Sequence, residues 1–186
     1  MASTADFRNG MVLDIDGTLF SIVEFMHVKP GKGGAFVRTK LKNVLSGAVL
    51  DKTFRAGEKV AEVRLESRGM QYLYNDGSHY YFMDSNTFEQ FPVSEQVIGE
   101  QVRYLKENME VTGLFQGDSL LMIELPFFIQ LKIVETDPGL RGDTVSGGTK
   151  PAKLESGATV NVPLFLNVGD VIKVDRRTNG YLERVS

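Results

Sequence analysis

Residues 18–41 are TLFSIVEFMHVKPGKGGAFVRTKL, two runs of aromatic and branched residues on either side of a polar centre. The first run is Thr18–Met26 and the second is Ala35–Leu41. Such runs, bounded by glycine and proline, are typical of β-strands. The centre, residues 29–34, holds one proline and three glycines, which favour a turn. The stretch therefore predicts a β-hairpin with a lysine, Lys32, at its tip.

The same pattern recurs along the rest of the chain. Turn signals separate the runs, and two of these signals, Asp16-Gly17 and Asn75-Asp76-Gly77, predict tight hairpin turns. The further predicted strands are Met11–Ile15, Met70–Tyr74, Tyr80–Met83, Met109–Gln116, Ser119–Leu125, Ile129–Glu135, Thr159–Leu166, Val171–Val174 and Gly180–Arg184.

One segment predicts a helix. Ser94 can cap its start, and Val97, Ile98, Val102 and Leu105 fall on one helical face. One helix against these many short strands predicts an all-β protein built of small barrels.

Charge divides the chain into three parts. Residues 1–65 carry 10 basic and 7 acidic residues, residues 66–128 carry 3 and 10, and residues 129–186 carry 8 and 7. We expect three consecutive domains with these bounds. The basic first part favours a polyanionic partner, whereas the acidic second part does not.

Composition excludes several classes of protein. Among 186 residues, 42% are hydrophobic and 24% charged, which excludes wholesale disorder. There is no cysteine and there are two histidines, which excludes disulfide scaffolds, structural His/Cys zinc sites and cysteine nucleophiles. No apolar run approaches the roughly 20 residues of a membrane span, and the N-terminus does not resemble a secretory signal. We expect a cytoplasmic protein.

Asp14-Ile15-Asp16-Gly17-Thr18 matches the nucleophile motif of haloacid-dehalogenase-type phosphatases, and Gly169-Asp170 with Asp175 imitates their acidic metal-binding motif. That fold needs crossover helices, and Leu19–Met26 alternates as a second strand instead. We therefore interpret the motif as a hairpin turn.

The glycine-rich segment 142–150, GDTVSGGTK, is one residue from a phosphate-binding loop. Gly148 stands where the lysine is required, and Pro151 follows where a helix should begin. Two readings stay open: a plain connecting loop, or a loop that presents N–H groups and hydroxyls to a phosphate or a base edge.

Five basic residues and no acidic one lie between Glu24 and Asp51: Lys29, Lys32, Arg38, Lys40 and Lys42. Pro30 stiffens the approach to the tip, and Gly31, Gly33 and Gly34 leave Lys32 without bulky neighbours. Arg38, Lys40 and Lys42 alternate, so that they share one face of a strand. The pattern is suited to an anionic cleft and predicts nucleic-acid binding through phosphates.

Several blocks together resemble the bacterial translation elongation factor P family over nearly the whole chain, from about Phe7 to Arg184. They are Lys29–Gly33, Met70–Tyr74, Phe82–Asp84, Pro138–Thr144, Gly147–Ala152 and Val162–Phe165. The resemblance implies an SH3-like (KOW-type) barrel followed by two OB-folds, in an L-shaped arrangement that mimics tRNA.

The resemblance also implies a function. It implies a monomer that binds both ribosomal subunits between the peptidyl-tRNA and exit sites and relieves stalling at consecutive prolines. Lys32 would contact the CCA end of peptidyl-tRNA and carry a covalent modification added by another enzyme. Gly142, Asp143 and Thr144 would approach the exit-site codon of the mRNA, and the acidic second domain would face a small-subunit protein. No catalytic residue, metal or dissociable cofactor is implied.

A generic OB-fold protein that binds single-stranded RNA remains the alternative. The bases of the bound RNA would stack on Phe36, Tyr72, Tyr74, Tyr80 and Tyr81. Aromatic rings at alternating strand positions are more often part of a core.

Overall fold

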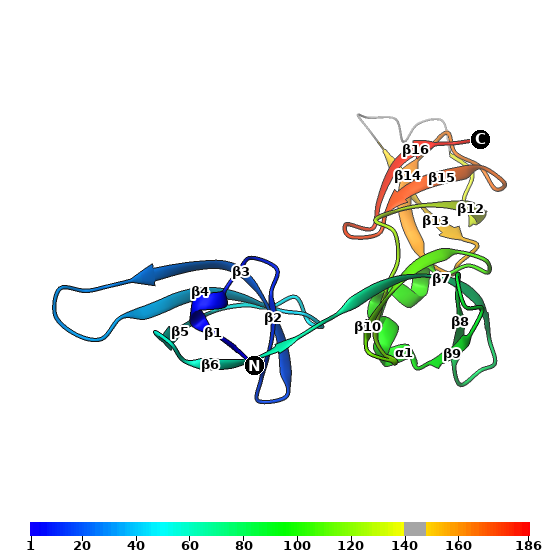
Figure 1. Ribbon diagram of the computed structural model, residues 1–186. Helices are drawn as coiled ribbons and strands as arrows, with labels where there is room; N and C mark the ends of the chain where they lie inside the picture. Colours follow the sequence, from blue (N-terminus) through cyan, green and yellow to red (C-terminus); the bar gives the residue numbers. More distant parts are fainter. Residues whose placement is uncertain (140–147) are drawn as a thin grey trace. The chain divides into compact units, whose positions relative to one another are not determined.

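The computed structural model describes residues 1–139 and 148–186 (Figure 1). Its first sheet is antiparallel: β2 to β5 pair in sequence order, and β6 returns to pair with β1 and β2. The strand order is β1-β6-β2-β3-β4-β5. Its elements are β1 (Ala2–Ser3), a 3-10 helix η1 (Thr4–Asp6), β2 (Val12–Ile15), β3 (Thr18–Val28), β4 (Phe36–Asn43), β5 (Val49–Arg55) and β6 (Lys59–Val63).

The first sheet packs around its own apolar core. Leu13, Val37 and Leu41 are fully buried, and each such side chain contributes about 1.5–3 kcal/mol relative to an exposed one. The other buried members of this core are Phe7, Met11, Ile22, Phe54 and Val60. Because the core draws on β2, β3, β4, β5 and β6, it fixes the base from which the β3–β4 hairpin extends.

The β2–β3 connection is a two-residue hairpin. Ile15 pairs with Thr18, and Asp16 and Gly17 between them have φ values of 53° and 80°. Two residues at positive φ make a type I′ turn, which matches the twist of the flanking strands. Gly17 N donates a hydrogen bond to Asp14 Oδ1 at 2.8 Å. The predicted turn at Asp16-Gly17 is therefore confirmed.

The second sheet has the strand order β11-β10-β7-β8-β9. Its strands are β7 (Glu66–Asn75), β8 (Tyr80–Asp84), β9 (Gln90–Val93), β10 (Glu110–Gln116) and β11 (Ser119–Glu124). The turn predicted at Asn75-Asp76-Gly77 joins β7 to β8. Its Asp76 Oδ1 accepts hydrogen bonds from the backbone N–H groups of Ser78 and His79, both at 2.8 Å.

The predicted single helix is wrong in its length. The α-helix α1 covers only Glu95–Ile98, and a 3-10 helix, η2 (Gly99–Tyr104), follows it. Gly99 has φ 69° and ψ −151°, values that end an α-helix, and Ser94 makes no side-chain cap hydrogen bond. The apolar positions still serve the core, because Ile98 and Leu105 are buried.

The third sheet is a closed barrel with the strand order β12-β13-β14-β16-β15. Its strands are β12 (Phe128–Thr136), β13 (Thr149–Leu154), β14 (Thr159–Pro163), β15 (Val171–Asp175) and β16 (Gly180–Arg184). Ile129, Leu131 and Ile133 of β12 point inward, since they are buried and alternate with exposed residues. With this barrel, the all-β prediction is confirmed.

The described chain divides into two compact units. The first comprises Met1–Ser67 and Leu114–Leu121, and the second comprises Arg68–Gly113 and Met122–Ser186. The division into three domains with bounds near residues 65 and 128 stays a prediction. No helix in the described ranges is long and apolar enough to cross a membrane.

The β7–β8 turn generates a prediction about protonation. Its backbone donors Ser78 and His79, together with the Tyr81 hydroxyl at 2.9 Å, lower the pKa of Asp76 to about 2. A folded pKa below the ordinary 3.8 means that this carboxylate stabilises the fold above about pH 4 and loses that contribution as the pH falls towards 2.

We expect NMR titration of the Asp76 carboxyl carbon to give a midpoint near pH 2, and Tyr81→Phe to raise it, because one donor is lost. Tyr80→Phe is the control, since the hydroxyl that reaches Asp76 belongs to Tyr81. A midpoint near 3.8 in the wild-type chain would contradict the turn geometry.

Candidate nucleic-acid interface

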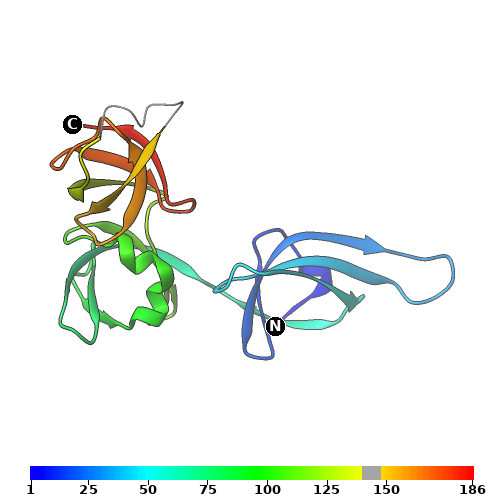
Figure 2. The ribbon, with the colours of Figure 1, turned by 180° about the vertical axis from the view of Figure 1, so that it is seen from behind.

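The β3–β4 hairpin carries the predicted basic tip. Pairing between the two strands continues to Val28 and Phe36, so that residues 29–35 form the loop. Figures 1 and 2 show this loop projecting past the other strands of its sheet. Long antiparallel pairing up to the loop gives the tip a defined position relative to the first core.

Space around the tip is open. A Cβ atom built on Gly31 or Gly34 would meet no heavy atom within 4 Å. Gly33 has φ 109°, in the left-handed region that glycine adopts at little cost. Lys32 is exposed and forms no hydrogen bond or ion pair with any residue that the structure describes. Its ammonium group is therefore available to a ligand.

The exposed face of β4 is basic, as the alternation predicted. Arg38, Lys40 and Lys42 are exposed, whereas Val37, Thr39 and Leu41 between them are buried. The inward hydroxyl of Thr39 is satisfied by the backbone carbonyl of Lys52 at 2.7 Å.

Two carboxylates flank the middle residue of this face. The register sets Lys40 opposite Glu24 on β3 and opposite Asp51 on β5. The Lys40 Nζ lies 3.4 Å from Glu24 Oε2. The sequence does not predict that the charge of Lys40 is neutralised. Glu24 and Asp51 lie at the two ends of the basic stretch in the sequence, and only strand pairing brings them beside its centre.

Arg38 has a different environment. Its cross-strand neighbours are the uncharged residues Met26 and Thr53, and its guanidinium lies 5.6 Å from the centre of the Phe36 ring. A shallow groove runs over the three paired residues Met26, Arg38 and Thr53. It continues over the next paired set, which contains Lys40.

Lys42 likewise has uncharged cross-strand neighbours, Ser21 and Val49. Arg38 and Lys42 can both meet a phosphate without competition from a directly opposite carboxylate, and the planar guanidinium of Arg38 is the better suited to a bidentate phosphate contact.

The loop residues Gly142, Asp143 and Thr144 lie outside the described residues, which stop at Gly139 and resume at Gly148. Lys150, on the far side of the gap, is 5% exposed, and its Nζ donates to the backbone carbonyl of Asp137 at 2.6 Å. Lys150 ends the segment that resembles a phosphate-binding loop. Its ammonium group is therefore already hydrogen-bonded to a backbone carbonyl.

The aspartates of the phosphatase motif serve local structure. Asp14 accepts the turn bond described above, Asp170 accepts from Asn167 N at 2.8 Å, and Asp175 pairs with Arg177 at 2.8 Å. Within the described ranges no group of three or more Asp, Glu or His side chains could hold a metal ion. The hairpin interpretation of Asp14–Thr18 is confirmed by the fold.

The five aromatic residues of the RNA-binding alternative do not form one exposed platform. Tyr72 is buried, and Phe36 lies beside Arg38. Tyr74 and Tyr81 stack on each other with ring centres 4.6 Å apart, and Tyr74 is 45% exposed. Tyr80 is half-buried and lies 6.2 Å from the Tyr72 ring.

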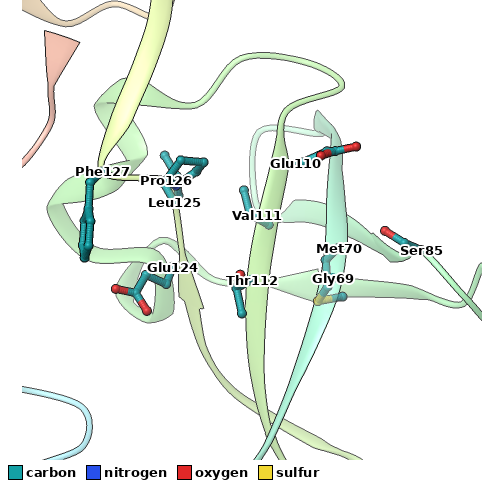
Figure 3. A pocket seen from close by; sticks show the side chains of 10 residues that line it. All are labelled: Gly69, Met70, Ser85, Glu110, Val111, Thr112, Glu124, Leu125, Pro126 and Phe127. Carbon is teal, nitrogen blue, oxygen red and sulfur yellow. The ribbon is translucent and has the colours of Figure 1, made fainter.

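A second groove lies on the second sheet and the segment that follows it (Figure 3). Glu110 on β10 and Glu124 on β11 contribute carboxylates, Ser85 contributes a hydroxyl, and Phe127 contributes an aromatic ring. No lysine or arginine lines it. Arg176 contacts the lining residue Glu124 at 3.6 Å, and Arg177 lies 4.5 Å from the centre of the Phe127 ring. The groove therefore has carboxylates in its lining and arginines at its border, in contrast to the basic face of β4.

Family models match nearly the whole chain. The elongation factor P KOW-like domain matches residues 3–60, the elongation factor P OB domain matches residues 65–123, and the elongation factor P C-terminal domain matches residues 123–184.

Individual proteins agree with these models. An elongation factor P of Caldanaerobacter subterraneus subsp. tengcongensis is 55% identical over 185 residues, covering 100% of both chains. An elongation factor P of Rhodococcus erythropolis is 58% identical over 186 residues, again covering 100% of both. Among solved structures, a translation initiation factor eIF-5A family protein from Naegleria fowleri matches with a TM-score of 0.53 at 12% identity, covering 67% of this chain and 96% of that one, which is a likeness of fold. By sequence over its full length, the chain belongs to the elongation factor P family.

Proposed function

We propose that this chain is a translation elongation factor that binds the ribosome between the peptidyl-tRNA and exit sites and stimulates peptide-bond formation at consecutive prolines. The observation that carries the proposal is the unobstructed Lys32 at the tip of the β3–β4 hairpin, in a chain of this family. In that site the tip contacts the CCA end of peptidyl-tRNA. Because its proposed partner is the ribosome, we place the protein in the cytoplasm.

The proposed role is orientation rather than catalysis. Proline is a restricted nucleophile because its ring fixes φ, and a peptidyl-tRNA end that moves freely makes its approach less productive. Holding the CCA end lowers the positional entropy that the reaction must otherwise lose. The factor then needs no catalytic side chain and no cofactor, and the chemistry belongs to the ribosome.

Lys32 is the proposed site of covalent modification by a separate enzyme. Its exposure and the absence of bulky neighbours at Gly31 and Gly33 leave the Nζ open to such an enzyme. An added group that bears an amine or hydroxyl would lengthen the reach of the tip and make charge-assisted hydrogen bonds to the tRNA backbone.

The remaining contacts divide by charge. Lys29, Arg38 and Lys42 are proposed to face tRNA phosphates, with Arg38 making the strongest contact of the β4 face. The sequence predicts the same role for Lys40, but Glu24 and Asp51 balance its charge. Residues 142–144 are proposed to approach the exit-site codon of the mRNA. The L-shaped, tRNA-like arrangement implied by the resemblance stays a prediction. The RNA-binding alternative gains no support from the aromatic rings, since Tyr74 is exposed but the other four are buried or half-buried.

The first functional prediction concerns the tip. Lys32→Ala should lower the rate of synthesis through consecutive prolines by about tenfold or more, the loss expected when a charge-assisted hydrogen bond of roughly 1.5–3 kcal/mol disappears. Thermal unfolding should not change, because Lys32 contacts no described residue through hydrogen bonds or ion pairs. A reconstituted translation assay with a diproline reporter measures the effect.

The matched control is Lys59→Ala, an exposed lysine on β6 away from the tip. Retention of full activity by Lys32→Ala, in protein purified with its native modification, would contradict the proposal. The mass of the intact protein, with a peptide map across residues 29–38, establishes which group is attached.

The second functional prediction separates Arg38 from Lys40. Arg38→Gln should weaken ribosome binding and reduce the slope of log affinity against log salt by about 0.7–0.9, the effect of one lost phosphate contact. Lys40→Gln should leave the slope nearly unchanged, because Glu24 and Asp51 already balance its charge. Equal changes in slope for the two variants would contradict this assignment.

A further inference from the structure

Phe88 has an unusual backbone conformation. Its φ is 61°, in the left-handed region, where the Cβ of an ordinary side chain crowds the following carbonyl oxygen. The other non-glycine residues at positive φ in the described ranges are Asp16, Asn108 and Asn179. Asp and Asn tolerate this region, whereas a bulky aromatic residue there is an outlier. Phe88 therefore costs folding free energy that Asn or Gly would not.

The side chain of Phe88 recovers little of that cost. It is 69% exposed, more than any other large apolar side chain described except that of Met1. No ring contact or cation–π contact joins it to the part of the chain that the structure describes. A strained residue whose side chain points into solvent is not explained by stability.

The loop around Phe88 is preformed. It connects β8 to β9 and is closed by hydrogen bonds from Asp84 N to Glu89 O and from Phe88 N to Asp84 O, both at 2.9 Å. The Asp84 carboxylate is buried and accepts from the backbone N–H groups of Asn86 and Thr87 at 2.8 and 3.1 Å. Little ordering of this loop is needed for it to present the ring.

The surroundings of this loop hold more carboxylates than cations, although Arg68 acts on Asp84 and Arg176 borders the adjacent groove. Ser85, within the loop, also lines the groove that holds Glu110 and Glu124 (Figure 3). Glu124 lies 3.6 Å from Arg176, whereas Glu110 forms no ion pair in the described ranges. Residues 66–128 carry 10 acidic and 3 basic residues. Such a surface repels RNA and attracts a basic protein.

We propose that Phe88 is the apolar anchor of a protein–protein interface, inserting into an apolar socket on a basic protein surface whose cationic side chains face the carboxylates of the adjacent groove. Aromatic anchors in desolvated pockets dominate the affinity of many interfaces. The inference rests on the proposed function in one respect: the partner is sought among the proteins of the ribosome.

The first test uses Phe88→Asn. Asn tolerates the left-handed region, so this variant should unfold at the same or a higher temperature, while its affinity for purified 70S ribosomes falls by about tenfold, as for loss of an interface hot spot. Phe165→Asn, at a ring that is 61% exposed in the third barrel, is the control and should bind as the wild type does.

Two results would overturn the interface. One is a lower unfolding temperature for Phe88→Asn, which assigns the ring a structural role. The other is unchanged affinity of that variant while the wild-type chain binds. If the wild-type chain itself fails to bind ribosomes, the proposed function fails, and the interface with it.

The second test identifies the chemistry of the partner. A photoreactive benzoylphenylalanine replaces Phe88, and the complex with purified ribosomes is irradiated. A crosslinked product that protease destroys and ribonuclease leaves intact supports a basic protein, which mass spectrometry then names. A crosslink to ribosomal or transfer RNA, or no crosslink from a bound complex, would overturn the proposal.

Discussion

The antiparallel pairing of β3 with β4 is the constraint on which the proposed activity depends. It runs from Phe20 opposite Asn43 to Val28 opposite Phe36, with one irregularity between Ile22 and Glu24. One end of this ladder is anchored by Ile22 and Leu41 in the first core. The other end carries Lys32, which is exposed and makes no hydrogen bond or ion pair with any described residue. A lysine on a long paired ladder has a defined position, whereas the same lysine on an unpaired loop of equal length would lose that position to conformational entropy.

Charge gives the surfaces of the chain different roles. On β4 the basic residues form one face, but the register places carboxylates beside Lys40 and leaves Arg38 without them. On the second sheet the groove has carboxylates and an aromatic ring and no lining cation. The proposed RNA and protein partners require surfaces of both kinds, because a uniformly basic surface would bind RNA without regard to orientation.

Much of the fold could be predicted from the sequence, since alternation and turn residues are local signals. The turns at Asp16-Gly17 and Asn75-Asp76-Gly77 carry their own conformational preferences and were predicted correctly. The sequence pattern does not predict β1, β5, β6, β9 or β13. Charged residues break the apolar runs of β5 and β6. In β9 and β13, Pro92 and Pro151 interrupt the pattern, although pairing with neighbouring strands tolerates both. The helix was predicted too long because the apolar period continues past Gly99, whose backbone conformation ends α1.

Some features of the candidate site could likewise be predicted from the sequence, and others could not. The tip glycines and the alternation of Arg38, Lys40 and Lys42 are visible in the sequence. The ion pair of Lys40 with Glu24 and the positive φ of Phe88 are not, because the first depends on strand register and the second on closure of the β8–β9 loop. Strand register is not displayed by a single sequence. The loop bonds are local, but positive φ is uncommon for an aromatic residue, so nothing at Phe88 signals it in the sequence.

The most direct measurement is a high-resolution electron cryomicroscopy map of the natively modified chain on a ribosome stalled at consecutive prolines. The account predicts that Lys32, or the group it carries, lies within hydrogen-bond distance, about 2.7–3.2 Å, of the CCA end of peptidyl-tRNA. A bound chain whose β3–β4 tip points away from that CCA end would contradict it.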